Sequence, residues 1–303
     1  MKGAFIGGRD ALSRLAGGFA AAGLELPAFC PDGAAGAAPL PRGLRLLGSA
    51  EELFSEPGLD FAAVSLPAGR AAAVIELALK RGLHAVCEPP FCASTTEFEA
   101  LRAAAAEAGR SVFPLQPWER SPVLRALEKA LDRGLAGEIN YTCVQELVVG
   151  PPPAEPAAAL WRPLSLLLSC ARLPPVAVAA RNPGGPAAAV HAHFNGADGF
   201  AHVAFNAAEA RLKISVSGAA GRLEADGGLL RLDVEGAPRE DVEFSDRPDA
   251  ARPEWLAAEL AEFRKEMEGT SPRGSGLRNA RYCVKLIRNS LYSASVKSAA
   301  VPL

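Results

Sequence analysis

The sequence has no long block of basic residues and no long apolar run, and its cysteines follow no paired spacing. Only 22% of the 303 residues are charged, and the formal net charge is −2. Such a charge gives no electrostatic reason to expect a nucleic acid or an anionic membrane as a partner. The apolar stretches fall far short of the ~20 residues that a membrane-spanning helix needs. We therefore expect neither a nucleic-acid nor a membrane partner.

The six cysteines are scattered without a CxxC motif or a Cys/His spacing typical of zinc sites. They indicate neither a disulfide framework nor a metal site, so we expect small buried side chains. The six are Cys30, Cys87, Cys92, Cys143, Cys170 and Cys283. From Lys2 the chain passes straight into a strand and a glycine turn, without the basic segment, apolar core and cleavage site of a signal peptide. A cytoplasmic location is expected.

A large apolar fraction, 49%, is present in a chain that is long enough for two domains. The clearest pattern lies between residues 58 and 91. The apolar run 61–66 is closed by Pro67, residues 71–80 carry apolar side chains at helical spacing, and residues 84–87 form another apolar run. This pattern predicts a strand, a crossover helix and a second strand.

The segment resembles the Gfo/Idh/MocA oxidoreductases, in which a strand ending in Thr-Pro-Asn, a helix, Gly-Lys-His-Val and Glu-Lys-Pro follow one another. The similarity continues through residues 48–60, 94–109 and 121–139 and through the closing helix and strand. It implies an α/β fold with an N-terminal Rossmann-like parallel-sheet domain over residues 1–118. A C-terminal α+β domain with an open, mainly antiparallel sheet would cover residues 119–303. It also implies NAD or NADP as cofactor and a sugar-like or polyol ligand.

The glycine-rich turn of a Rossmann domain is altered in this chain. If Gly7 is the first glycine of the Gly-x-Gly-x-x-Gly fingerprint, Arg9 stands at the second glycine and Leu12 at the third. Both replacements add bulk where the fingerprint has none, so cofactor seating is expected to suffer. Arg9 could instead pair with a phosphate, or Gly7 and Gly8 could simply shape a strand-to-helix turn.

Two further cofactor contacts are altered or shifted. Asp32 lies about 20 residues after the glycine turn, the separation expected of the acidic ribose ligand, although a turn residue is the alternative. Ser65 and Pro67 match the segment beside the nicotinamide ribose, but Ala68 replaces the family's Asn. The resemblance assigns the cofactor contacts to Gly7, Gly8, Arg9, Asp32, Ser65, Pro67 and Glu88. In the family the glutamate also holds the loop between the domains.

The catalytic positions of the family are replaced here. Pro89 stands at the Glu-Lys-Pro lysine, and in residues 160–180 Pro163 and Leu166 stand at the histidine and the aspartate. None of these three side chains can take a proton from a hydroxyl group. In the same segment Arg162 could bind a carboxylate or phosphate, or it could face solvent.

A hairpin in the second domain carries three histidines on one face: His191, His193 and His202. A turn at residues 196–199 would place His193 opposite His202. Three imidazoles could bind a metal, but no carboxylate or cysteine completes the set in this interpretation, so we expect a polar sheet face and no metal. Since family members associate through this sheet, a homo-oligomer is expected.

Residues 253–269 form an amphipathic pattern typical of a core-packing helix. The functional prediction is an oxidoreductase of the Gfo/Idh/MocA type with weak or no hydride transfer, and NAD or NADP binding would itself be impaired. One alternative is an active oxidoreductase with relocated groups, such as Arg9 for phosphate. Another is a non-catalytic ligand-binding or regulatory protein that partners an active paralogue.

Overall fold

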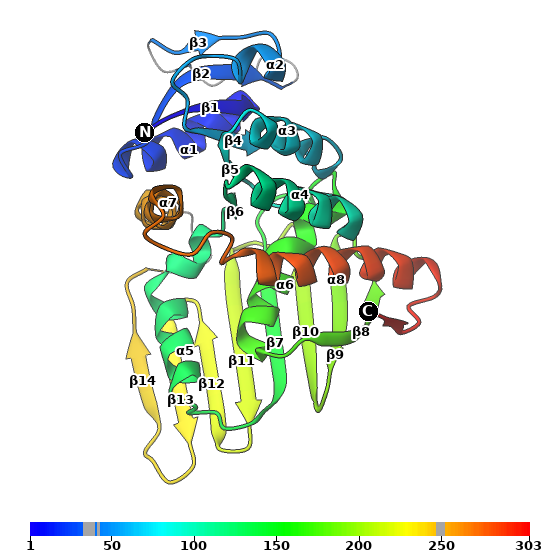
Figure 1. Cartoon of the computed structure of the whole chain (residues 1–303). Helices are drawn as coiled ribbons and strands as arrows, with labels where there is room; N and C mark the ends of the chain where they lie inside the picture. Colours follow the sequence, from blue (N-terminus) through cyan, green and yellow to red (C-terminus); the bar gives the residue numbers. More distant parts are fainter. Residues whose placement is uncertain (33–39, 41–42, 247–251) are drawn as a thin grey trace. The chain divides into compact units, whose positions relative to one another are not determined.

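The computed structural model describes residues 1–32, 40, 43–246 and 252–303 (Figure 1). Two compact units divide the chain. Unit 1 contains Met1–Pro117 and Arg252–Arg281, and unit 2 contains Trp118–Ala251 and Tyr282–Leu303. The predicted boundary after residue 118 lies one residue from the first change of unit, whereas residues 252–281 return to unit 1. The two-part division expected from the sequence differs from the observed units at this segment.

Unit 1 contains a parallel six-stranded sheet in the order β3-β2-β1-β4-β5-β6. Its strands are Lys2–Gly7 (β1), Glu25–Pro31 (β2), Arg45–Leu46 (β3), Phe61–Ser65 (β4), His84–Cys87 (β5) and Val112–Pro114 (β6). The strand order reverses between β1 and β4, which is the switch point where ligands of such sheets bind. Because helices cover a parallel sheet on both faces, its central strands β1 and β4 are mostly buried, and all of β5 is buried.

Four helices connect the strands of unit 1, and a fifth returns from later in the sequence: Arg9–Ala21 (α1), Ala50–Leu53 (α2), Ala68–Lys80 (α3), Thr95–Ala108 (α4) and Pro253–Glu268 (α7). The apolar stripe of α7 joins the Rossmann core, as the ring contact between Phe61 and Phe263 at 5.7 Å shows. The prediction of a core-packing helix is confirmed. Helix α7 packs on unit 1, because its buried side chains and those of α1 belong to the same core.

Unit 2 contains a nine-stranded sheet in the order β14-β13-β12-β11-β7-β10-β9-β8-β15. The strands are Ile139–Leu147 (β7), Pro175–Arg181 (β8), Ala187–Phe194 (β9), Ala197–Ala204 (β10), Arg211–Gly218 (β11), Gly221–Asp226 (β12), Leu229–Val234 (β13), Glu240–Glu243 (β14) and Val301–Pro302 (β15). Strands β7 and β10 pair in parallel and the other neighbours pair antiparallel. The predicted fold class is confirmed.

Helices cover one face of this sheet (Figure 1). They are Pro122–Asp132 (α5), Pro156–Ala171 (α6) and part of Leu277–Ser295 (α8), and the short 3-10 turn Pro117–Arg120 precedes α5. In β9 buried and half-buried residues alternate, so Val190 and Ala192 face these helices while His191 and His193 face outward. We call this second side the outer face.

The hairpin of β9 and β10 has a different register from the one predicted. Phe194 pairs with Ala197, so the turn is the two-residue Asn195–Gly196 rather than residues 196–199. Gly196 has a φ of +85°, a conformation that glycine adopts readily in a two-residue turn. The shorter turn places Asp198, not His202, opposite His193, and the predicted His193–His202 pairing is therefore wrong.

All six cysteines are buried and unpaired, as predicted for small core side chains. None of the helices among the described residues combines the length and the apolar character needed to cross a membrane.

Candidate functional site

The ends of β1 and β4 meet at the switch point of the parallel sheet. Gly7 pairs with Ser65 in register, and a Cβ on Gly7 would lie 2.5 Å from the Ser65 carbonyl oxygen. The φ angle of Gly7 is also +154°, which side chains disfavour. Gly7 is therefore required by this turn, as the fingerprint indicated.

Helix α1 begins immediately after the turn. Gly8 is its N-cap residue, no side chain caps the helix, and a Cβ on Gly8 would meet no atom within 4 Å. An uncapped N-terminus of a 13-residue helix presents free N–H groups and a partial positive charge, which suit a phosphate. Arg9 is half-buried at the first helical position, and its Nε has no hydrogen-bond partner. This open, donor-rich turn fits a pyrophosphate.

Leu12 does not obstruct that turn. Its side chain is buried among Phe5, Leu15 and Phe19 in the core between α1 and the sheet. The side chain at the third fingerprint position therefore packs in the core. Of the two replacements expected to impair cofactor seating, Arg9 and Leu12, the second leaves the turn open.

Asp32 lies beside the glycine turn, and its N–H donates to the Gly7 carbonyl at 2.9 Å. Arg70, in the first turn of α3, donates two hydrogen bonds to the Asp32 carboxylate, one of them at 2.6 Å from Nη2. The carboxylate is thus held in place at the expected ribose position, with a guanidinium beside it. No local pattern points to Arg70, because the two residues are 38 positions apart.

Glu88 directly follows β5 and accepts hydrogen bonds from two sides. Arg14 of α1 donates at 2.8 and 2.9 Å, and the Ser65 hydroxyl donates at 2.6 Å. The hydrogen bond to Glu88 raises the pKa of Arg14. Arg14 is a site residue that the sequence analysis missed. Two residues after Ser65, Pro67 is the N-cap residue of α3, and Ala68 is the first residue of that helix. Pro89 follows Glu88, and its side chain has no group that can transfer a proton.

In unit 2, α6 carries Pro163 and Leu166, the two other positions where the resemblance predicts a replaced catalytic residue. Pro163 and Leu166 are both buried, so apolar side chains occupy them. Arg162 pairs with Glu146 at 3.0 Å and lies over the Trp118 ring, 5.7 Å from its centroid. With only 23% of its side chain exposed, Arg162 does not face solvent as one alternative held.

Glu146 contacts the start of α6 through its ion pair with Arg162. Burial raises its pKa, and the charge of Arg162 opposes that rise. The residues around Glu146 do not reveal its burial, because a strand glutamate that faces solvent and one that faces the core can have the same local sequence.

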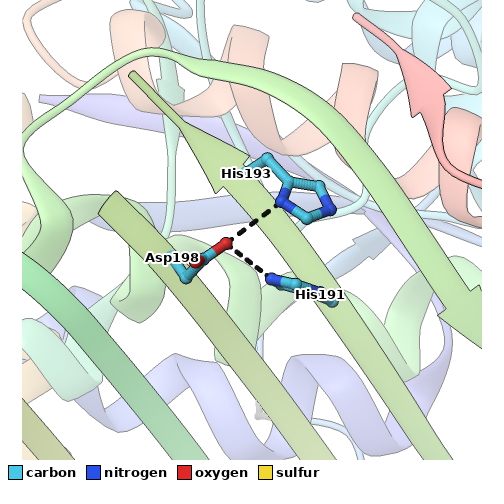
Figure 2. A group of neighbouring side chains, drawn as sticks. All are labelled: His191, His193 and Asp198. Atoms are coloured by element: carbon cyan, nitrogen blue, oxygen red, sulfur yellow. Dashed lines mark hydrogen bonds and ion pairs between the residues drawn. The ribbon is translucent and has the colours of Figure 1, made fainter. Parts of the chain in front are cut away.

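A second polar cluster lies on the outer face of the unit 2 sheet (Figure 2). One oxygen of Asp198 accepts hydrogen bonds from His191 Nε2 at 2.7 Å and from His193 Nδ1 at 3.0 Å. The hydrogen bond from His191, followed by the one from His193, lowers the pKa of Asp198. The expectation that no carboxylate completes the set is wrong, since the misplaced turn had put Asp198 in the loop. His202 stays outside this cluster, beside Phe200.

The parallel sheet with its switch-point glycine turn and the mainly antiparallel second sheet define a two-unit fold whose first unit is of the Rossmann type. Residues 20–115 match the model of the Gfo/Idh/MocA family, which is described as an oxidoreductase family with an NAD-binding Rossmann fold. Over this region the chain is similar to that family, and the resemblance of its motifs is supported there.

One curated relative is the uncharacterized oxidoreductase YfiI of Bacillus subtilis (strain 168), which is 24% identical over 96 residues. The match covers 32% of this chain and 24% of the relative, so it spans about a quarter of the relative's length.

Solved structures match over the whole chain. An oxidoreductase from Pseudomonas syringae is 18% identical with a TM-score of 0.82, covering 100% of this chain and 98% of that one. An inositol dehydrogenase homolog from Azotobacter vinelandii, complexed with NADH and myo-inositol, is 19% identical with a TM-score of 0.78, covering 100% and 97%. At such identities the likeness shows the fold.

Proposed function

We propose that this chain binds NAD or NADP at the ends of β1 and β4 and transfers hydride weakly or not at all. The proposal rests on a difference between the cofactor-binding turn, which suits a pyrophosphate, and the expected catalytic positions, which hold no base. Gly7, Gly8 and the uncapped start of α1 suit a pyrophosphate, while Pro89, Pro163 and Leu166 offer no base. A bound nicotinamide cofactor supplies or accepts a hydride. Oxidation of a carbinol also requires a group that takes the hydroxyl proton, which these three side chains cannot do.

The ligand of this site is proposed to be a sugar or a similar polyol. The proposal is an analogy with the inositol dehydrogenase homolog, whose structure contains myo-inositol. The outer face of the unit 2 sheet is proposed to join two copies of the chain.

Titration with NADH and NADPH, followed by cofactor fluorescence and by calorimetry, tests the cofactor proposal. Gly8→Glu places a carboxylate in the open space at the start of α1, where it should repel the pyrophosphate and weaken binding at least about tenfold. Gly17→Glu is the control, because it puts the same charge on the same helix where a Cβ also has open space. Absence of binding at millimolar cofactor would sink the proposal.

Pro89→Lys tests the loss of chemistry. We expect no measurable turnover of sugars or polyols from this variant, because Pro163 and Leu166 still supply no proton acceptor. Turnover in the unsubstituted chain would instead favour an active enzyme with a relocated base. Glu146 is then the group to replace by glutamine, since its carboxyl is buried beside Arg162 and has a raised pKa.

A second candidate is a non-catalytic ligand-binding or regulatory protein that partners an active paralogue. The hydrogen bonds from Arg14 and Ser65 to Glu88 favour it, because a carboxylate held from both sides connects structural elements and does not need a cofactor as its partner. Binding of a polyol without binding of either dinucleotide would support this candidate over the first.

A further inference from the structure

Two histidines and one aspartate converge on the outer face of the unit 2 sheet. His191 and His193 are two positions apart in β9, so their side chains leave the same face. Asp198 of β10 pairs in register with His193 and points at both rings (Figure 2). We propose that His191, His193 and Asp198 bind a divalent transition-metal ion such as Zn²⁺.

The geometry of the three ligand atoms is close to what the ion needs. One ring nitrogen of His191, one of His193 and a carboxylate oxygen of Asp198 all lie within 4.8 Å of one another. At the ~2.0–2.1 Å bond lengths of zinc, tetrahedral ligand atoms stand roughly 3.3 Å apart. The observed contacts of 2.7 and 3.0 Å must therefore open by roughly half an ångström, which the Asp198 side chain, 53% exposed, can accommodate.

The ligand types select the class of ion. Two imidazoles and one carboxylate suit zinc and the neighbouring divalent transition metals, whereas Ca²⁺ and Mg²⁺ prefer oxygen ligands throughout. Three protein ligands leave at least one coordination position for water or for a donor from another molecule.

The scaffold holds the imidazoles in place. Both rings are carried by a strand that is hydrogen-bonded on each side, and Phe200 stacks on His191 with centroids 4.2 Å apart and an interplanar angle of 16°. The His191 and His193 rings are themselves 3.9 Å apart. Because little side-chain freedom remains to be lost, binding an ion costs little ordering entropy.

The other soft ligands of the chain compete poorly for the ion. All six cysteines are buried. His84 is only 6% exposed, and its Nδ1 accepts a hydrogen bond from the Ser111 N–H. His202 is the remaining histidine, and it lies on the same face without contacting Asp198. This makes His202 a matched control.

The test uses the full chain without an affinity tag, since a polyhistidine tag would itself bind the ion. Zn²⁺ binding is measured by competition with a chromophoric chelator, and Co²⁺ is added to record the visible absorption of its four- or five-coordinate complexes. We expect one ion per chain, with affinity reduced more than about tenfold in His193→Ala and in Asp198→Asn. His202→Ala should bind like the parent chain.

A thermal melt supplies a second, independent measurement. An ion that binds only the folded state raises the melting temperature, so Zn²⁺ should stabilise the parent chain and the His202→Ala variant but not His193→Ala. Circular dichroism of each variant without metal shows whether it is folded. No binding at micromolar Zn²⁺, or equal binding by the folded variants, would overturn the proposal. Neither result depends on cofactor binding by unit 1.

Discussion

At the scale of single residues, the turn after β1 depends on two adjacent glycines for different reasons. Gly7 combines a φ of +154° with a Cβ position only 2.5 Å from the Ser65 carbonyl oxygen. Gly8, with a φ of −71°, has open space where its Cβ would be. One glycine is therefore required by the fold, and the other leaves room for a ligand.

We predict that Gly7→Ala lowers the free energy of unfolding by about 1–3 kcal/mol, because the backbone becomes strained and the oxygen of Ser65 must shift. Gly8→Ala should cost less than about 1 kcal/mol, since only an N-cap preference changes. Urea denaturation of both variants measures the difference. Equal losses would show that the close approach of β1 to β4 is not what requires Gly7.

His84 links stability to pH. Burial, followed by the charges of Arg110 and Arg273, lowers its pKa from 6.5 to about 4. The unfolded chain takes up this proton near pH 6.5, whereas the folded chain resists it until pH is near 4. The folded state therefore loses stability as pH falls through that window, and the contribution of neutral His84 is fully present above it.

Between pH 7.5 and pH 5 we predict that His84 accounts for a loss of about 1–2 kcal/mol in the free energy of unfolding. His84→Gln lacks the titrating group, so its stability should change less over the same interval. Urea denaturation at both pH values gives the comparison. Identical pH dependence of the two chains would contradict the assignment.

At the scale of elements, α1 and α7 pack through a glycine that the sequence does not distinguish from its neighbour. A Cβ on Gly18 would lie 2.4 Å from Leu256 Cδ2 and 2.5 Å from its Cγ, while a Cβ on Gly17 would meet nothing within 4 Å. Both glycines are inside α1, so alanine improves helix propensity equally at the two positions.

Gly17→Ala should therefore raise the free energy of unfolding by about 1 kcal/mol. Gly18→Ala should be less stable than Gly17→Ala by about 1–3 kcal/mol, because the added methyl group overpacks the contact with Leu256. The difference between the two denaturation midpoints isolates packing from propensity. A Gly18→Ala variant as stable as Gly17→Ala would mean that α7 moves aside freely.

At the scale of the whole molecule, the outer face of the unit 2 sheet is the surface through which we propose that two copies associate. Tyr141 and Leu147 of β7 lie on this face and are both 38% exposed. Tyr141 also contacts Phe200, so aromatic side chains of two neighbouring strands meet on this face. Exposed apolar patches of this kind are typical of association surfaces.

Tyr141→Lys should shift the chain from dimer to monomer in sedimentation velocity experiments, because it places a charge on the proposed contact surface. Tyr292→Lys is the control, since Tyr292 of α8 is 58% exposed and lies outside the sheet. A parent chain that sediments as a monomer at all concentrations would contradict the dimer.

The sequence alone determined both fold classes, because strand and helix periods, turn residues and the family motifs are local in the chain. It placed Gly7, Ser65 and Glu88 correctly at adjacent strand ends, since parallel pairing follows from the βαβ pattern. Tertiary structure alone decided which side chains meet. The Arg70–Asp32 and Arg14–Glu88 pairs join residues 38 and 74 positions apart, and no local pattern encodes such contacts. The two-residue Asn-Gly turn sets the register of the hairpin, and this register places Asp198 beside the two histidines.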